Sequence, residues 1–275
     1  MIKVRLYGGL GNQIFQLGIS IYIAKILKRK ITICNFTNGY KTQRKNQLST
    51  LFDLDQLNVS VSDESDILHR IRLGKMLSLN YSKLTTVNDK NISNYLNNRL
   101  SSIKGDVVYL DGYFQSCFNQ NIFDSVVESL SSALLVGGRG ALDENVATIH
   151  IRGGDFLSSK VHFSLGREYY ESGIQSLSRY VDRFIIVTDD KEYASKVVCD
   201  LNFPPNSHIE ISQSLSALND FELIMDSKYS ILSNSTFSIW AGALSTKIAT
   251  FAPARLSINI NKNFKFKNEI FWSEK

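Results

Sequence analysis

The chain has 275 residues, of which 43% are hydrophobic and 21% charged, and its formal net charge is +5. This length allows one large domain or two of ordinary size, and the composition is that of a globular protein. No run of about 18 apolar residues indicates a membrane span, and the first residues lack the apolar core of a signal peptide. The three widely spaced cysteines, Cys34, Cys117 and Cys199, indicate neither a disulfide framework nor a zinc site.

The mild positive charge suits an anionic substrate or an acidic membrane surface. It does not indicate nucleic acid, because no platform of aromatic and basic residues accompanies it. The odd number of widely spaced cysteines fits a reducing cytosol, so we expect a cytoplasmic protein, with peripheral contact at the inner (cytoplasmic) membrane as the alternative. The Lys-rich segment 261–267 is interpreted as a solvated end, and contact with anionic lipid is its alternative.

The first half opens with a predicted strand at residues 3–7, a glycine turn, a helix at 12–28 and a strand at 30–34. This order predicts parallel strands joined by a right-handed crossover. On the helix, Gly18 and Ala24 are expected to allow close packing against a sheet. Residues 42–104 are polar and weakly periodic, so we predict loops and short helices there.

The rest of the chain alternates strands and helices more regularly. After a strand at 107–110 and a helix at 119–135, the strands predicted are 145–151, 183–188, 207–211, 229–232 and 247–251. The helices predicted between them are 167–180, 191–201, 217–226 and 237–244. This order predicts an α/β protein with mostly parallel sheets. A glycine-rich break places the domain boundary between residues 138 and 139.

Gly8-Gly9-Leu10-Gly11-Asn12-Gln13 joins a strand to a helix, where backbone N–H groups approach phosphates or sugars. It is not a dinucleotide fingerprint, because Ile14 replaces the third glycine and the second strand ends in Asn35 rather than an acidic residue. A tight turn with Asn12 capping the helix is the structural alternative.

The stretch His150-Ile151-Arg152-Gly153-Gly154-Asp155-Phe156 ends a buried strand in two glycines. Ligands of open α/β sheets bind at that end of the strands. On a strand, His150 and Arg152 would share one face, and a fixed guanidinium there suits a diphosphate. The structural alternative is an ion pair between Arg152 and Asp155.

Two later turns also carry polar groups. Asp189-Asp190 follows a strand; such pairs bind metal or ribose hydroxyls, but more often cap the next helix. The run Ser233–Trp240 puts hydroxyls at a helix start, which forms an anion site without metal or an ordinary cap by Ser235 or Thr236. Asp53-Leu54-Asp55 has the D-x-D pattern of some metal-dependent sugar transferases but follows no apolar strand, so we do not predict a metal there.

Five segments together resemble the bacterial α-1,2-fucosyltransferases of glycosyltransferase family 11. They occur in the family's order and approximate spacing: Gly8–Gln16, Asp111–Ser116, His150–Phe156, Thr188–Asp190 and Ser233–Trp240. The resemblance implies two Rossmann-like domains facing a cleft, a GT-B-like fold, with residues 1–138 on the acceptor side and 139–275 binding the nucleotide sugar. It also implies inverting transfer of L-fucose from GDP-fucose to the 2-hydroxyl of a terminal galactose in a surface glycan or O-antigen-type acceptor. No metal or other cofactor is expected.

The resemblance also implies roles for single residues. Arg152 would hold the leaving diphosphate, with His150 beside the nucleotide and Asp220 on guanine. Ser235, Thr236 and Ser238 would hold the β-phosphate. Gly9 and Gly11 would contact the donor, and Asn12 would face the reaction centre from the other domain.

Two points remain open at this level. The family's second arginine in the central motif is replaced by Gly153, which bears on donor affinity and acceptor choice. For the catalytic base Asp155 is the first candidate, with Asp111, Glu168 or no dedicated base as alternatives. The competing hypotheses are a transferase for another sugar nucleotide or linkage, a non-catalytic sugar-nucleotide-binding protein and, least favoured, a nicotinamide oxidoreductase.

Overall fold

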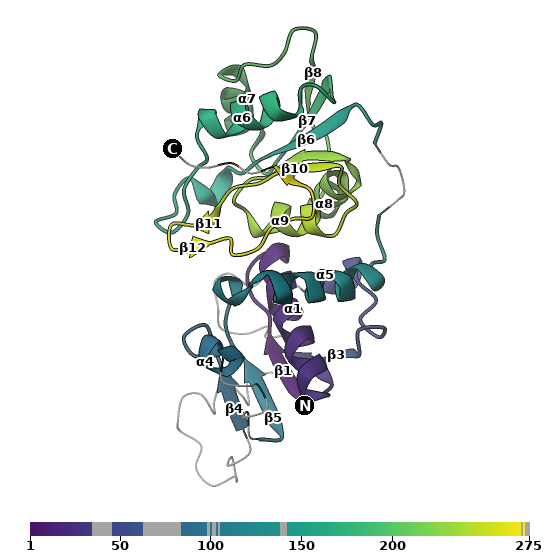
Figure 1. The fold of residues 1–275 in the computed structure, drawn as a ribbon, viewed down its shortest axis with the longest axis vertical. Coiled ribbons are helices and arrows are strands. Elements are labelled where there is room, and N and C mark those ends of the chain that lie inside the picture. The colour runs from purple at the N-terminus through teal and green to yellow at the C-terminus, as the bar shows by residue number, and fades with distance from the viewer. Residues whose placement is uncertain are drawn as a thin grey trace. The chain divides into compact units, whose positions relative to one another are not determined.

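The computed structural model describes residues 1–34, 46–62, 84–97, 100, 103, 105–137, 142–270 and 272. The chain divides into two compact units, Met1–Leu135 and Val136–Lys275. The predicted boundary, between residues 138 and 139, falls outside the described residues. Each unit is an α/β body with its own sheet (Figure 1).

The sheet of the first unit has five parallel strands in the order β3-β2-β1-β5-β4. The strands are β1 (Ile2–Arg5), β2 (Ile31–Cys34), β3 (Val59–Ser62), β4 (Leu84–Val87) and β5 (Val107–Leu110). The helices are α1 (Leu10–Leu27), α2 (Leu48–Leu51), α4 (Ile92–Asn97) and α5 (Gln120–Ser132), with a 3₁₀ helix η2 (Gln115–Cys117).

The prediction for residues 42–104 is wrong at β3 and β4, which are the two edge strands of this sheet. Their sequences, Val-Ser-Val-Ser and Leu-Thr-Thr-Val, are short and half polar because an edge strand has one neighbour and is less buried. Gly18 of α1 was expected to lie on the sheet. It instead lies against α5, where a Cβ would come within 2.6 Å of Val126 Cγ1.

The second unit has a six-stranded parallel sheet in the order β13-β10-β9-β6-β7-β8. Its strands are β6 (Val146–Ile151), β7 (Arg183–Thr188), β8 (His208–Ile211), β9 (Tyr229–Ile231), β10 (Ala249–Phe251) and β13 (Glu269–Ile270). Its helices are α6 (Arg167–Leu177), α7 (Lys191–Cys199), α8 (Ala217–Asp226) and α9 (Thr236–Ala243). A 3₁₀ helix η3 (Gly154–Phe156) and a small hairpin of β11 (Arg255–Ser257) and β12 (Ile260–Asn261) complete it.

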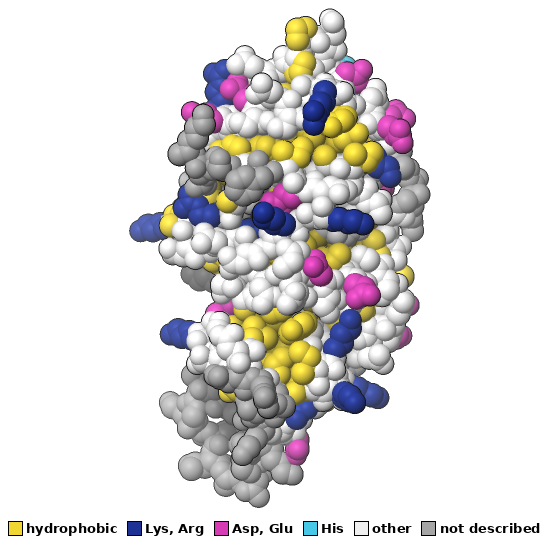
Figure 2. Space-filling model, in the orientation of Figure 1, with side chains coloured by type: hydrophobic (Ala, Val, Ile, Leu, Met, Phe, Trp, Pro, Cys, Tyr) yellow, Lys and Arg dark blue, Asp and Glu magenta, His cyan; other side chains and the backbone are white. Residues whose placement is uncertain are grey.

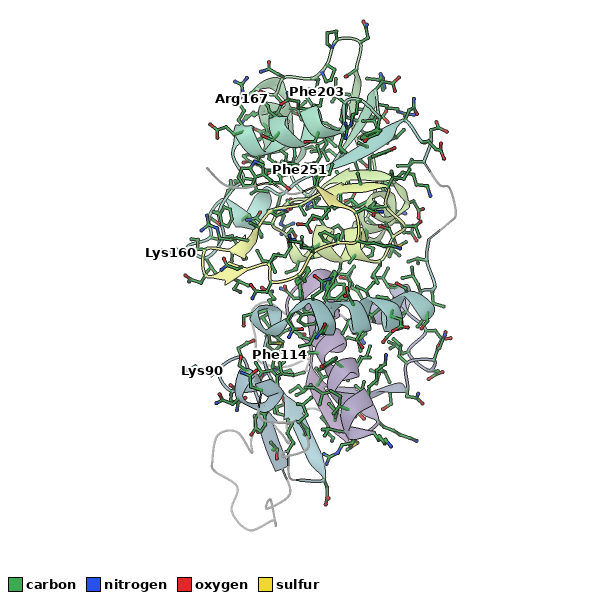
Figure 3. The ribbon with its side chains drawn as sticks, viewed as in Figure 1. Lys90, Phe114, Lys160, Arg167, Phe203 and Phe251 are labelled. Carbon is green, nitrogen blue, oxygen red and sulfur yellow. The ribbon has the colours of Figure 1, made fainter. Side chains whose placement is uncertain are left out.

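Successive side chains of β6 point to opposite faces of the sheet. Ile149 and Ile151 belong to a core with Tyr169 and Ile174 of α6, and Phe251 (labelled in Figure 3) completes it with ring centroids 5.1 Å from Tyr169. On the opposite side α8 contacts β6 and β7. Helices therefore cover both faces of this sheet, and the loops at the carboxyl ends of its strands are left to form a site.

Among the helices that the structure describes, none is both long and apolar enough to cross a membrane.

Candidate active site

The strand order of the second unit reverses between β6 and β9. From β6 the chain moves outward through β7 and β8, then returns to the other side of β6 with β9 and moves outward again to β10. In such a doubly wound sheet the two loops at this point leave in opposite directions and open a crevice at the carboxyl ends of the strands. The loops after β6 and β9 carry the two motifs that the sequence singled out, Arg152–Phe156 and Ser233–Ser238.

His150, in β6, joins these two loops. Its side chain is buried, and its Nδ1 lies 2.7 Å from the hydroxyl of Ser233, which follows β9. Burial, and then the charge of Arg152, lowers the pKa of His150 to about 3. The imidazole is therefore neutral near pH 7, and it orients Ser233 rather than offering a charge to a phosphate.

Arg152 lies one residue beyond β6, in a fixed position. Its Nη1 is 2.5 Å from Oδ2 of Asp189, and its guanidinium carbon is 5.2 Å from the ring centroid of Phe156. Its side chain keeps 19% of its surface exposed. Asp189 follows β7, the strand next to β6, so neighbouring strand ends supply both charges. The alternative pair of Arg152 with Asp155 involves a side chain outside the described part of the chain.

The two glycines after Arg152 are held by the same acidic turn. Gly153 N–H donates to Asp189 Oδ1 at 3.0 Å, and Gly154 N–H, at a φ of +53°, donates to Asp190 Oδ2 at 3.3 Å. A Cβ at Gly153 would lie 2.7 Å from Asp190 Cβ and 3.0 Å from Cδ1 of Tyr193. The second arginine of the family therefore has no room on this backbone.

The two carboxylates after β7 have different roles. Asp190 caps α7 by accepting from Tyr193 N–H at 3.0 Å, and this bond and the one from Gly154 lower its pKa. This confirms the capping interpretation for Asp190. Asp189 instead holds Arg152 and Gly153, a role that the sequence pattern does not predict.

The turn after β9 is built from its own hydroxyls. Ser235 is the N-cap of α9, accepting from Phe237 N–H at 3.3 Å, and its own N–H donates to Ser233 Oγ at 3.1 Å. Ser238 is buried and donates to the carbonyls of Ser233 and Ser235. Thr236 is the first residue of α9. Ser238 thus shapes the turn, while Ser235 and Thr236 stand at the helix N-terminus, where partial positive charge favours an anion.

Asp220 lies in the first turn of α8. It accepts a hydrogen bond from the hydroxyl of Ser214, which follows β8, and burial raises its pKa. A half-buried carboxylate beside strand ends is suited to accept N–H groups from a purine edge.

In the first unit, the glycine motif Gly8–Gln13 covers part of the loop between β1 and α1 and the start of the helix. Gly8 has a φ of +80°, and a Cβ there would meet Asn12 Nδ2 at 2.6 Å. The helix begins at Leu10 with Gly9 as N-cap, so the interpretation of Asn12 as the cap is wrong. Asn12 lies in the first turn and accepts from Gln115 Nε2 at 2.9 Å, while Gly11 is buried in that turn.

The side chain of Asp155, the first candidate for the catalytic base, lies outside the described part of the chain, and the structure places the two alternative carboxylates. Asp111, after β5, lies 3.8 Å from Arg5 at the end of the neighbouring strand β1, and each side chain is 8% exposed. Glu168 is exposed in the first turn of α6.

Asp53 and Asp55, the D-x-D pair, form a turn in which Asp53 Oδ1 accepts from Gln56 N–H at 3.0 Å. No cluster of His, Cys, Asp or Glu suited to a metal occurs among the residues that the structure describes.

Comparisons with known proteins agree with this architecture. The model of the family Glycosyl transferase family 11 matches residues 1–271. An α-1,2-colitosyltransferase from Escherichia coli is 25% identical, with 89% of this chain and 87% of that protein covered. The O-antigen biosynthesis glycosyltransferase WbnK, also from Escherichia coli, is 24% identical, with 88% and 89% covered. The structure of the fucosyltransferase NodZ from Bradyrhizobium is similar at 13% identity, with a TM-score of 0.56 and coverage of 89% and 93%.

The two parallel-sheet units have the GT-B-like fold of fucosyltransferases, as predicted. The protein is thus a glycosyltransferase. Arg152, paired with Asp189, lies at the switch point of its second sheet. The protein belongs to glycosyltransferase family 11, because the family match covers nearly the whole chain.

Proposed function

We propose that this glycosyltransferase transfers L-fucose from GDP-fucose to the 2-hydroxyl of a terminal galactose in an O-antigen-type glycan, with inversion and without a metal. The observation that carries the proposal is Arg152, held by Asp189 at the switch point, where a nucleotide diphosphate is expected. The names of the two relatives support an α-1,2 linkage and an O-antigen acceptor.

The charge of the leaving group explains why the proposed reaction needs positive charge in a fixed position. Breaking the bond between the sugar and GDP develops negative charge on the β-phosphate. The Arg152 guanidinium and the N-terminus of α9 supply stabilisation that needs no rearrangement during the reaction. Removing one such donor typically lowers a rate by about 10²–10³-fold.

The neutral state of His150 fits the same scheme. A second charge beside Arg152 would be costly in a buried position, whereas a neutral ring can hold Ser233 and, through it, the backbone of Ser235. Asp220 completes the proposed donor site, since a carboxylate can accept both N–H groups of guanine.

A second candidate donor is GDP-linked colitose, because one relative is named an α-1,2-colitosyltransferase. Colitose lacks the 3-hydroxyl of fucose, so the two donors make the same demands on the diphosphate site and differ only at the sugar. We place the protein in the cytoplasm, with peripheral contact at the inner membrane as part of the proposal. This location suits an acceptor assembled on the membrane.

The test is release of GDP from each donor, with and without galactose-terminated acceptors, by wild type and Arg152→Ala. The matched control is Arg183→Ala, which breaks an ion pair of similar length, 2.7 Å to Glu210, at the amino end of β7 and thus away from the carboxyl ends of the strands. We expect acceptor-dependent release that falls at least about a hundredfold in Arg152→Ala and stays near wild type in Arg183→Ala.

The other outcomes separate the hypotheses. GDP release without an acceptor effect would support the donor and reject the acceptors tested. Faster turnover of GDP-colitose would assign the alternative donor. Binding of GDP-fucose without any turnover would favour a non-catalytic sugar-nucleotide-binding protein, and no binding at all would reject the proposed donor.

A further inference from the structure

A basic hollow lies in the first unit, away from the glycine turn. It has a volume of about 440 Å³ and is lined by the end of α1, the start of β2, the end of α5 and the turn before β3. The glycine turn follows the carboxyl end of β1, whereas the hollow is at the amino ends of β2 and β3. None of the residues assigned above to the transfer reaction lines this hollow.

Four cations line this hollow, namely Lys25, Lys28, Arg29 and Lys30, and no carboxylate does. Within the described part of the chain, none of the four side chains forms an ion pair or a hydrogen bond. Arg29 Nη1 is buried and has no hydrogen-bond partner among those residues. Figure 2 shows Lys and Arg side chains gathered near the position that Figure 1 labels as the N-terminus.

Lysines at a helix end have an ordinary explanation, because the C-terminus of a helix carries partial negative charge. Two helices, α1 and α5, end beside the hollow and together contribute about one negative charge. This negative charge offsets only part of the positive charge of the four side chains. The excess positive charge, and the buried guanidinium nitrogen, are not explained by the helices.

We propose that this hollow binds a phosphate-bearing anion. A guanidinium matches the oxygen pairs of a phosphate, and lysines add unspecific attraction. Ser129, Ser132 and Asn58 also line the hollow, and the two serine hydroxyls, which donate to carbonyls of α5, keep the capacity to accept a hydrogen bond. The volume falls within the range of about 300–1,000 Å³ that small-molecule sites occupy. The phosphate could belong to the headgroup of an anionic lipid or to a soluble molecule.

The test compares two triple variants with equal charge. Lys25→Gln/Lys28→Gln/Arg29→Gln removes three cations from the hollow. Lys160→Gln/Arg179→Gln/Lys196→Gln removes three exposed cations, also two lysines and one arginine, from the second unit and leaves the segment 261–267 unchanged. Each variant lowers the formal net charge from +5 to +2, since 5 − 3 = 2. Circular dichroism checks the fold of both, and Lys25→Gln/Lys28→Gln, which keeps Arg29, serves if the first triple variant is unfolded.

Two probes separate the sources of the phosphate. Inorganic pyrophosphate, titrated calorimetrically, represents a soluble ligand, and the titration is repeated in Arg152→Ala so that binding at the proposed donor site is recognised. Co-sedimentation with vesicles of phosphatidylcholine, with and without phosphatidylglycerol, represents a lipid headgroup. Neither readout depends on transferase activity, so the proposal and the proposed function fail independently.

We expect binding of at least one probe to weaken on the order of a hundredfold in the hollow variant and to stay near wild type in the control. Pyrophosphate binding that persists in Arg152→Ala would assign a soluble ligand. Pelleting only with phosphatidylglycerol vesicles would assign a lipid headgroup. Equal loss in both triple variants, or no binding of either probe by wild type, would overturn the proposal.

Discussion

At the scale of single residues, the position of Arg152 depends on Asp189. The carboxylate takes Nη1 of Arg152 with one oxygen and the N–H of Gly153 with the other. A guanidinium held in this way is oriented before the donor arrives, which is the condition for effective electrostatic stabilisation of a leaving group. The glycine beside it is part of the same arrangement, because only a residue without a Cβ fits against Asp190.

This packing predicts the result of restoring the family's second arginine. Gly153→Arg should lower the free energy of unfolding by about 1–3 kcal/mol, because a Cβ has to displace Asp190 or Tyr193. The measurement is urea unfolding of the variant and wild type. A variant that is fully stable and binds GDP more tightly would contradict the steric explanation.

His150 predicts a pH dependence of stability. Its pKa is about 3 in the folded chain and near 6.5 when unfolded. Below pH 6.5 the unfolded state therefore binds a proton that the folded state does not, and stability falls as the pH falls towards 3. Between pH 7 and pH 5 this residue should remove about 2 kcal/mol of unfolding free energy.

The check is unfolding of wild type and His150→Asn at both pH values. Asn removes the titration and keeps a polar group near Ser233. Between pH 7 and pH 5 the variant should therefore lose about 2 kcal/mol less unfolding free energy than wild type. Equal losses in the two proteins would show that His150 titrates normally or is not the group responsible.

At the scale of elements, the N-terminus of α9 has one observed role and one proposed role. Ser235 caps the helix, and the same helix end is proposed to hold a phosphate. Asn119 caps α5 in the first unit in a comparable way, accepting from Ile122 N–H at 3.0 Å. The pair therefore offers a comparison between a cap inside the proposed site and a cap outside the donor site.

Ser235→Ala and Asn119→Ala should each cost about 1 kcal/mol of stability, since each frees one helix N–H. Only Ser235→Ala should also raise the KM for the sugar nucleotide, because α9 is the helix at the switch point. Steady-state kinetics with unfolding curves check both parts. An equal rise in KM in the two variants would argue against a phosphate at α9.

At the scale of the whole molecule, the proposed donor residues other than those of the glycine turn all belong to the second unit. Both tryptophans, Trp240 and Trp272, belong to it as well, so tryptophan fluorescence reports the unfolding of that unit. Trp240 is fully buried, which makes its emission sensitive to loss of the core.

GDP at about a hundred times its Kd should therefore stabilise the second unit by about 2.7 kcal/mol. Urea unfolding followed by tryptophan fluorescence, with NAD as the control nucleotide, measures this directly. Stabilisation by NAD but not by GDP would contradict the assignment of the nucleotide and revive the oxidoreductase hypothesis.

Local sequence accounts for most of the fold. The strand 183–188 and the helix 217–226 were predicted with the observed bounds, because apolar periodicity and caps are encoded within a few residues. The strands β3 and β4 were missed, since at a sheet edge the pairing partner stabilises a segment whose own pattern is weak.

The candidate site divides in the same way. The sequence by itself determined two local motifs of the proposed site, namely Arg152 at the end of an apolar strand and the hydroxyl run at the start of α9, because motif composition is local. Only the tertiary structure decided that Asp189 holds Arg152, that His150 is buried and neutral beside Ser233, and that Gly153 has no space for a side chain. The physical reason is that these contacts join loops after β6, β7 and β9, and the order of strands in a sheet follows from how the whole unit packs.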